Sequence, residues 1–441
     1  MTYPAAVRYL DCLANYEKNT NYSYKETLKL ARIQDFLSVI GNPQESLRVI
    51  HISGTKGKGS TCAFAAYILR EAGFCVGLYT SPHLNDFRER IRILWPVVSR
   101  ARTAKDFEGQ ISKRELSCLV KELKPAVNKY NRHCRYGPLS FFEVYTAIAF
   151  LYFKRRQVDF VVLETGMGGR LDATNASDSL VSGITPVSFE HVQKLGSTLA
   201  KIAGEKAGII KNKGTIVISA LQNQEAEKVI HKRCKRFRAS LYEVGKQIKY
   251  FKGKQSFTIK GLRKVYKNLR LSLLGEHQIA NASLAVGLVE GLSFYGFNIG
   301  AQAIRKGLYN TAWPGRCEVI ARNPLVVLDG AQNLASAGVL RSATEDNFKY
   351  RKLILVLGIS DDKDIPGICR TLNPLADEII LTRAATRRAT DPKRMSGYFK
   401  RKLYLTQSVK EAKLLAGRIA HKEDLILVTG SLFVVGEFRN A

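Results

Sequence analysis

The sequence predicts an α/β protein of two domains, each built on a mostly parallel β-sheet with helices on both faces. Three observations support this prediction. The chain has 441 residues, which is more than one compact core usually holds. Short runs rich in β-branched residues alternate with longer amphipathic stretches, as strands do when each one leads into a helix. These runs form two series that meet near residue 310, so we expect domains at residues 1–309 and 310–441.

The first series contains five expected strands and ends in a different pattern. The strands are RVIHIS (48–53), CVGLY (75–79), DFVVLE (159–164), LVSGIT (180–185) and GTIVIS (214–219). Between Ala239 and Leu274 apolar and polar residues alternate at close spacing, as in QSFTIKG and NLRLSLLG. Such alternation is typical of half-buried antiparallel strands, so we expect a small antiparallel insert there.

The second series follows the stretch NTAWPGR (310–316) and predicts a smaller, Rossmann-like doubly wound domain. Its expected strands are LVVLDG (325–330), LILVLG (353–358), EIILTR (378–383) and LILVTG (425–430). Ligands of such sheets bind at the carboxyl ends of the strands. We therefore expect the functional site in a cleft between the two domains.

The net charge of +31 is high, and it favours anionic partners such as nucleic acid or polyanionic metabolites. Lysine and arginine occur along the whole chain, however, and are denser only at HKRCKRFR (231–238), TRRATDPKRM (386–395) and YFKRK (398–402). None of these stretches has the interleaved aromatic residues of a recognition motif. We therefore attribute the charge to a bias of the whole proteome and expect no nucleic-acid partner.

Cysteine spacing and hydropathy indicate the cellular setting. The eight cysteines are scattered singly, without a Cys-x-x-Cys pair, so we expect reduced thiols rather than disulfides or a zinc site. No N-terminal targeting signal is present, and no apolar run approaches the roughly 20 residues that span a bilayer. We expect a soluble, cytoplasmic protein without a membrane partner.

A glycine-rich loop, GTKGKGS (54–60), connects the first expected strand to a helix. Glycines at 54, 57 and 59 allow successive backbone N–H groups and the helix N-terminus to face one anion, and Lys58 can reach its outer phosphates. The spacing differs from the standard P-loop in two ways: only three residues separate Gly54 from Lys58, where the standard loop has about five, and Gly59 separates Lys58 from Ser60. We interpret the loop as the phosphate loop of a P-loop ATPase-like domain. The alternative is an ordinary strand-to-helix turn.

A glutamate, Glu164, ends the expected strand DFVVLE. A carboxylate there can meet a magnesium ion held by nucleotide phosphates, because magnesium prefers hard oxygen ligands and takes few of them from the protein. The following TGMGGRLDATN (165–175) combines glycines with an arginine and an aspartate, which suggests close approach of the backbone to a ligand. This context disfavours the alternative, a surface glutamate without a ligand.

Eight motifs together resemble a known family. They are HISGTKGKGSTCAF, YTSPHLNDFRERIRI, LETGMGGRLDATNA, EHVQKLGSTLAKIAGEKAGIIK, GEHQIANASLA, WPGRCEVI, LDGAQN and VTGSLFVVGEF. In this order they resemble the folylpolyglutamate synthase and dihydrofolate synthase family of the ATP-dependent Mur ligase superfamily. The resemblance implies a Mur ligase central-type ATP-binding domain at 1–309 and a glutamate-ligase domain at 310–441.

The resemblance also implies roles for individual residues. Those that would bind ATP are Gly54, Thr55, Lys56, Gly57, Lys58, Gly59, Ser60, Asn281, Arg316 and Asp329. Those that would bind magnesium are Ser81, Glu164 and His191. Those that would bind the pterin-bearing substrate are Ser140, Phe142 and Glu143, within LSFFEVYTA (139–147), and Leu171, Asp172 and Ala173. The implied cofactors are ATP, Mg²⁺ and a monovalent cation.

Four residues would carry the chemistry: Lys58, Lys206, His191 and Arg316. Lys206 matches the lysine that the family carbamylates, which turns an ammonium into an anionic oxygen donor. From the residues alone, Lys206 would be a surface ion-pair partner. His191 alone would suggest an ordinary core or surface histidine, because imidazole is not the usual ligand of magnesium. Arg316, at the domain joint, can hold a triphosphate with two parallel hydrogen bonds.

Three stretches depart from the family pattern. Gln332 in DGAQN stands where the family usually has a histidine, so no proton can be carried at that position. Glu190 stands where an aspartate is usual, and the longer side chain can still orient His191. The segment LWPVVSRARTAKDFEG (94–109) matches poorly, and we expect an enlarged basic loop there.

The activity that the resemblance implies is ATP-dependent ligation of L-glutamate to dihydropteroate and to reduced folates through an acyl phosphate, by a monomeric enzyme. LSFFEVYTA favours the bifunctional bacterial type over a single-activity member. A Mur-type amino-acid ligase is an alternative, although it should carry a further N-terminal domain and only 47 residues precede RVIHIS. A nucleic-acid-binding P-loop ATPase and an inactive scaffold are the remaining alternatives.

Overall fold

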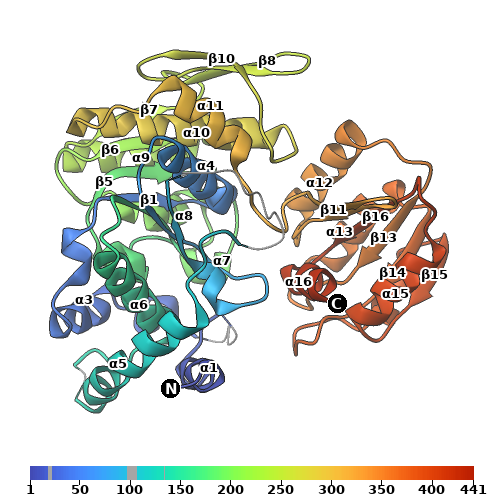
Figure 1. Ribbon diagram of the computed structural model, residues 1–441, viewed down its shortest axis with the longest axis horizontal. Coiled ribbons are helices and arrows are strands. Elements are labelled where there is room, and N and C mark those ends of the chain that lie inside the picture. Colours follow the sequence, from blue (N-terminus) through green and yellow to red (C-terminus); the bar gives the residue numbers. More distant parts are fainter. Residues whose placement is uncertain (18–21, 97–106, 134) are drawn as a thin grey trace.

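The computed structural model describes residues 1–17, 22–96, 107–133 and 135–441. Within these ranges the chain forms two parts, each with its own sheet (Figure 1). Most of the expected basic loop, residues 97–106, lies outside the described residues, and so does Cys134.

The N-terminal part is built on a seven-stranded sheet in the order β3-β2-β4-β1-β5-β6-β7. Its strands are β1 (Val49–Ser53), β2 (Val76–Tyr79), β3 (Ile91–Leu94), β4 (Phe160–Glu164), β5 (Ser179–Ile184), β6 (Ile216–Ser219) and β7 (Ser240–Glu243). All neighbours pair in parallel except β3, which runs antiparallel to β2. The five strands expected in this part are confirmed. β1 and β4 are buried throughout, as continuous apolar runs in a covered parallel sheet should be.

Helices cover both faces of this sheet (Figure 1). The helices are α1 (Tyr3–Asp11), α2 (Tyr24–Thr27), α3 (Leu30–Val39), α4 (Lys58–Glu71), α5 (Lys113–Arg132), α6 (Phe141–Arg155), α7 (Val192–Leu195), α8 (Leu199–Lys206), α9 (Gln224–Phe237), α10 (His277–Gly291) and α11 (Ala301–Asn310). α4, α10 and α11 share one apolar core with the sheet, and α1, α3, α5 and α6 share a second core with its other face. Short 3₁₀ turns, η1 (Pro43–Ser46), η2 (Phe87–Arg90), η3 (Ala173–Ala176), η4 (Ala207–Ile209) and η5 (Leu292–Tyr295), complete the connections.

The antiparallel insert is smaller than the sequence suggests. β8 (Lys249–Lys252), β9 (Phe257–Lys260) and β10 (Val265–Leu269) form the three-stranded antiparallel sheet at the top of Figure 1. Ser240–Glu243 belongs instead to the large sheet, where β7 pairs in parallel with β6. β7 is a partly exposed edge strand of only four residues, so its sequence lacks the continuous apolar run of the central strands. Most of NLRLSLLG lies beyond β10.

The C-terminal part contains a six-stranded sheet in the order β11-β12-β16-β13-β14-β15. Its strands are β11 (Glu318–Arg322), β12 (Leu325–Leu328), β13 (Leu353–Leu357), β14 (Glu378–Leu381), β15 (Lys402–Leu405) and β16 (Leu425–Thr429). Its helices are α12 (Leu334–Asn347), α13 (Ile365–Leu372), η6 (Asn373–Leu375), α14 (Pro392–Ser396), α15 (Val409–Ile419) and α16 (Leu432–Asn440). All pairs are parallel except β11 with β12. The four expected strands and the doubly wound fold are confirmed.

The connection between the two parts runs from the end of α11 at Asn310 to the start of β11 at Glu318. The expected domain boundary at 309/310 falls at the start of this connection and stays a prediction. Among the described residues, no helix has the length and apolar character needed to cross a membrane.

Candidate active site

The predicted site residues gather at the carboxyl ends of adjacent parallel strands. β1 lies between β4 and β5, and β2 lies on the far side of β4. The phosphate loop follows β1, Glu164 ends β4 and Ser81 follows β2 by two residues. The sheet order therefore brings together residues that are far apart in the sequence, at the place where doubly wound sheets bind their ligands.

The phosphate loop requires glycine at two positions. Gly57 has a φ of +83° and precedes the first residue of α4. A Cβ at Gly57 would overlap the side-chain amide of Asn281, and one at Gly54 would overlap the Thr185 side chain. The loop thus passes between β5 and α10 with its backbone N–H groups at the N-terminus of a 14-residue helix, an arrangement that suits a phosphate. Asn281 lies against this loop, and its implied role in binding ATP stays a prediction.

Three lysines lie in or beside this loop: Lys56 and Lys58 belong to it, and Lys206 reaches it from the end of α8. The ammonium groups of Lys58 and Lys206 both donate to the Gly54 carbonyl oxygen, at 3.1 and 2.6 Å. Lys56 forms an ion pair with Glu190 at 2.6 Å. Lys206 is only 2% exposed, and burial, followed by the positive charge of Lys58, lowers the pKa of its amine to about 7. This concentration of positive charge attracts an anion and leaves Lys206 partly neutral near neutral pH.

Glu164 is a buried carboxylate, 5% exposed, beside these lysines. It accepts a hydrogen bond from the backbone N–H of Ser81 at 3.0 Å, and it forms no ion pair with any described residue. Burial raises its pKa, opposed mainly by the charge of Lys58. A buried carboxylate next to a serine offers the hard oxygen atoms that magnesium prefers, so Glu164 and Ser81 fit a magnesium ion.

His191 fits this ion less well. It is exposed and precedes the short helix α7 in a left-handed conformation, with a φ of 51°. Among the described residues its ring makes no hydrogen bond or ion pair. Its predicted role as a metal ligand stays a prediction.

Arg316, which precedes β11, lies near the site, although its implied role stays a prediction. The loop that carries Arg316 is joined to the loop after β12, because the Gly330 N–H donates to the Gly315 carbonyl at 2.9 Å. The Asp329 carboxylate accepts from the N–H groups of Cys317 and Ala331, at 2.9 and 2.8 Å. The charge of Arg316 acts on Glu164 and opposes the rise in its pKa that burial causes. Arg316 thus lies within electrostatic reach of the phosphate-loop edge.

The predicted pterin residues of α6 have structural partners. Ser140 caps α6, and both its N–H and its hydroxyl donate to the Glu143 carboxylate, at 2.8 and 2.6 Å. Glu143 also forms a buried ion pair with Arg32 at 2.8 Å. Phe142 lies against Gly166, where a Cβ would come within 2.7 Å of its ring. The polar groups of Ser140 and Glu143 are therefore satisfied inside the protein, and the Phe142 ring lies against the glycine-rich loop.

That loop is held in place by Asp172. Its carboxylate accepts from the N–H groups of Met167 and Thr174, at 2.9 and 3.0 Å, and burial raises its pKa. A Cβ at Gly169 would come within 2.7 Å of the Lys206 carbonyl oxygen, so the loop packs directly on the end of α8. Leu171 and Ala173 flank Asp172. Their binding roles stay predictions.

Three buried threonines near the predicted site are not predicted from the sequence. The hydroxyls of Thr61, Thr165 and Thr185 are buried and have no hydrogen-bond partner among the described residues. Each directly follows a predicted feature: Ser60, Glu164 and the end of β5. Thr165 and Thr185 directly follow strand ends and Thr61 lies in the first turn of α4, and these positions are the only sequence signal for them. Buried hydroxyls normally find a hydrogen-bond partner, so these three are notable.

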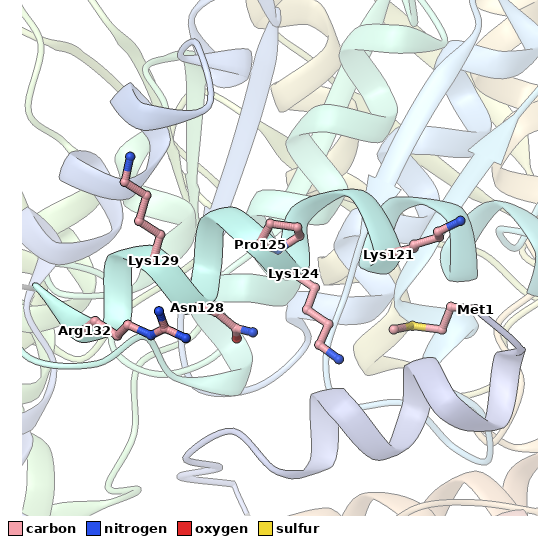
Figure 2. Close-up of a pocket in the computed structure, with 7 residues that line it drawn as sticks. All are labelled: Met1, Lys121, Lys124, Pro125, Asn128, Lys129 and Arg132. Carbon is pink, nitrogen blue, oxygen red and sulfur yellow. The ribbon is translucent and has the colours of Figure 1, made fainter.

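A separate groove lies away from this cluster, between α5 and the N-terminus (Figure 2). Its volume is about 610 Å³, and it is lined by Met1, Lys121, Lys124, Pro125, Asn128, Lys129 and Arg132. None of the predicted site residues lines it.

Comparison with known proteins agrees with this architecture. Residues 135–289 match the Mur ligase middle domain, and residues 315–432 match the Mur ligase glutamate ligase domain. The chain is 33% identical over 420 residues to the dihydrofolate synthase/folylpolyglutamate synthase of Bacillus subtilis, covering 93% of this chain and 94% of that protein.

Solved structures are similar over almost the whole chain. The Mycobacterium tuberculosis folylpolyglutamate synthase complexed with ADP and AMPPCP has a TM-score of 0.84 and 30% identity, covering 99% of this chain and 98% of that one. E. coli FolC in complex with DHPP and ADP has a TM-score of 0.83 and 26% identity, covering 99% and 96%. The order of the motifs, the two sheets and these similarities agree: the chain belongs to the folylpolyglutamate synthase/dihydrofolate synthase family of the Mur ligase superfamily.

Proposed function

We propose that the chain is an ATP-dependent ligase that joins L-glutamate to dihydropteroate and to reduced folates, releasing ADP and phosphate. One observation supports this most: the phosphate loop, a buried unpaired carboxylate and Lys206 converge at one sheet edge, within reach of Arg316 from a glutamate-ligase domain. The bifunctional form is proposed because the Bacillus subtilis relative bears both synthase names.

The first step transfers a phosphoryl group. The N–H groups of the phosphate loop and Lys58 bind the ATP phosphates, and Asn281 supports the loop. The terminal carboxylate of the acceptor attacks the γ-phosphorus, the bond to ADP breaks, and an acyl phosphate forms. Because such a reaction spreads charge over the transferring group, its catalysis depends on positioning and electrostatics. Lys58 and Arg316 supply the positive charge.

The second step forms the amide. The amine of L-glutamate attacks the activated carbonyl carbon, and the carbon–oxygen bond to phosphate breaks. Closure of the two domains excludes the water that would otherwise hydrolyse the acyl phosphate. The loop after Ser81 already contacts the C-terminal domain, because Leu84 packs with Val434 and Val435 of α16.

Magnesium fits the site through Glu164 and Ser81, for the reasons given above. When bound there, the ion would neutralise phosphate charge and orient the phosphates. A monovalent cation, a monomeric state and a cytoplasmic location stay predictions.

We further propose that Lys206 is carbamylated. A neutral amine adds CO₂, forming a nitrogen–carbon bond and releasing one proton. The lowered pKa of Lys206, about 7, keeps the amine reactive near neutral pH. The product would replace a cation beside the phosphate loop with an anionic oxygen donor.

Phosphate release tests the proposal. Mg-ATP and L-glutamate are supplied with dihydropteroate, with tetrahydrofolate, or with neither acceptor. Release with both acceptors supports the bifunctional enzyme, and release with only one names a single-activity enzyme. If neither acceptor raises release above the ATP-only background, the proposed function is wrong.

A further inference from the structure

Gly59 separates Lys58 from Ser60, which are adjacent in the standard P-loop, and the structure shows what lies against it. It is the second residue of α4. A Cβ at this position would come within 3.0 Å of Cζ2 and 3.3 Å of Nε1 of the Trp313 indole. The missing side chain makes room for this tryptophan.

Trp313 lies in the connection between the two domains and is held from several sides. It packs against the apolar core that α4, α10 and α11 share. The guanidinium carbon of Arg92 is 5.8 Å from its ring centroid, and the Phe107 ring meets it edge-on at 6.4 Å. Arg92 is fully buried, and its Nη1 has no partner among the described residues. The indole face therefore contributes to the stabilisation of a buried cation.

The same short stretch is fixed at its other end to the C-terminal domain. Gly315 and Cys317 bond to the loop that carries Gly330 and Asp329. Arg316 lies between them, three residues after Trp313. One end of this stretch thus rests on the phosphate loop and the other holds the arginine that the second domain contributes.

We propose that Trp313 is a positioning residue. The contact of its indole with Gly59 fixes the position of Arg316 relative to the phosphate loop. This inference rests on the proposed role of the loop in binding ATP. Trp313 acts through Arg316 and through the loop, which it contacts directly. Packed groups transmit displacements because protein interiors leave little empty space, and a misplacement of about 1 Å is enough to lower a rate by roughly a hundredfold.

A double-mutant cycle tests the coupling. Trp313→Ala is expected to lower kcat at least about tenfold and to leave the KM for ATP within about threefold, as for an interaction made in the transition state. The double variant with Arg316→Ala should be no slower than Arg316→Ala alone, because both changes remove the same interaction. Multiplicative losses would overturn the proposal. Trp313→Phe keeps an aromatic ring and should retain activity within about threefold.

Gly59→Ala tests the contact between Gly59 and Trp313 by changing the glycine. It also replaces Trp313→Ala as the test if that variant does not fold. Its Cβ would press on the indole at 3.0 Å, so kcat should fall in the protein with Trp313. In the Trp313→Phe background the loss should be smaller, because the phenyl ring leaves more room. An equal loss in both backgrounds would contradict the proposal.

A fluorescence measurement separates this inference from the proposed ligase activity. The sequence contains two tryptophans, and Trp95 is 54% exposed, so Trp95→Phe leaves Trp313 as the only one. Titration with Mg-ATP should change its emission with the same saturation that calorimetry gives for ATP binding. Binding without a change in emission would overturn the coupling. A change in emission without ligation of any acceptor would leave the coupling standing and refute the proposed function.

Discussion

At the residue scale, the proposed carbamylation of Lys206 should make the activity sensitive to pH and to CO₂. Its pKa is lowered to about 7, first by burial and then by Lys58. Below that pH the amine is protonated and cannot add CO₂, so activity should fall as the pH drops from about 8 to about 6. Added bicarbonate should partly restore activity near pH 7. The measurement is the initial rate after equilibration at each pH, with and without bicarbonate.

Lys206→Arg is the control for this prediction. Arginine keeps the positive charge but stays protonated at these pH values, so the variant should be slow at every pH and indifferent to bicarbonate. A variant that keeps the wild-type rate would show that carbamylation plays no part.

Glu164 is the second residue whose chemistry is open to test. Glu164→Gln keeps the shape and removes the charge, so phosphate release should fall about a hundredfold or more, and the magnesium concentration for half-maximal rate should rise. Glu290→Gln is a matched control, because Glu290 is also buried but receives hydrogen bonds from Leu262 and Tyr266 near β10. The control should lower thermal stability without changing magnesium dependence. The same magnesium dependence in both variants would rule out Glu164 as a ligand.

Arg32 is a buried partner of Glu143 that the sequence does not reveal. LSFFEVYTA indicates a substrate site, but the sequence does not show that Glu143 pairs with a buried arginine 111 residues away. Arg32→Met should lower the free energy of unfolding by about 3 kcal/mol, because it leaves a buried carboxylate without its partner. Urea denaturation measures this, with the exposed Arg114→Met as control. An unchanged free energy of unfolding with a raised KM for the pterin substrate would instead favour a direct binding role.

At the scale of elements, the phosphate loop and the helix after it form the unit that the sequence predicts best. Glycine spacing and the flanking strand and helix indicate the loop, and the structure adds the contacts of Gly57 with Asn281 and of Gly59 with Trp313. Those contacts cross more than 200 residues of sequence, so no local pattern reveals them. The resemblance to a family singles out Asn281, but not the tryptophan.

Gly57→Ala and Gly73→Ala separate backbone strain from contact at the two ends of this helix. Both glycines have positive φ, +83° and +93°, but only at Gly57 would a Cβ meet another side chain, since nothing lies within 4 Å at Gly73. Each variant should lose about 1 kcal/mol of stability. Only Gly57→Ala should weaken ATP binding by about tenfold or more, as measured by calorimetry. Equal ATP affinities would contradict the assignment of the loop.

The sequence also predicts some strands better than others. Buried central strands such as β1 and β4 appear as continuous apolar runs, which sequence analysis detects. The edge strands β7, β11 and β15 are partly exposed and lack such runs. The four-residue strand β3 is buried but is not among the strands expected from the sequence. Whether a strand can be recognised from its sequence therefore depends on its position in the sheet, and that position is set by the whole chain.

At the scale of the whole molecule, the net charge of +31 should raise the local concentration of anionic substrates. Excess positive charge attracts ATP and glutamylated substrates, and salt screens this attraction. The KM values for ATP and for the folate acceptor should therefore rise with ionic strength while kcat changes little. A kcat that falls with salt at constant KM would show that the charge instead affects the chemical steps.

The measurement that tests the central claim most directly follows an oxygen atom. Dihydropteroate labelled with ¹⁸O in its carboxylate is incubated with Mg-ATP and L-glutamate, and the phosphate and the pterin product are analysed by mass spectrometry. If the carboxylate attacks the γ-phosphorus and the glutamate amine then displaces phosphate, each phosphate carries one labelled oxygen and each product carries one added glutamate. Unlabelled phosphate, or no glutamate-dependent product, would contradict the account.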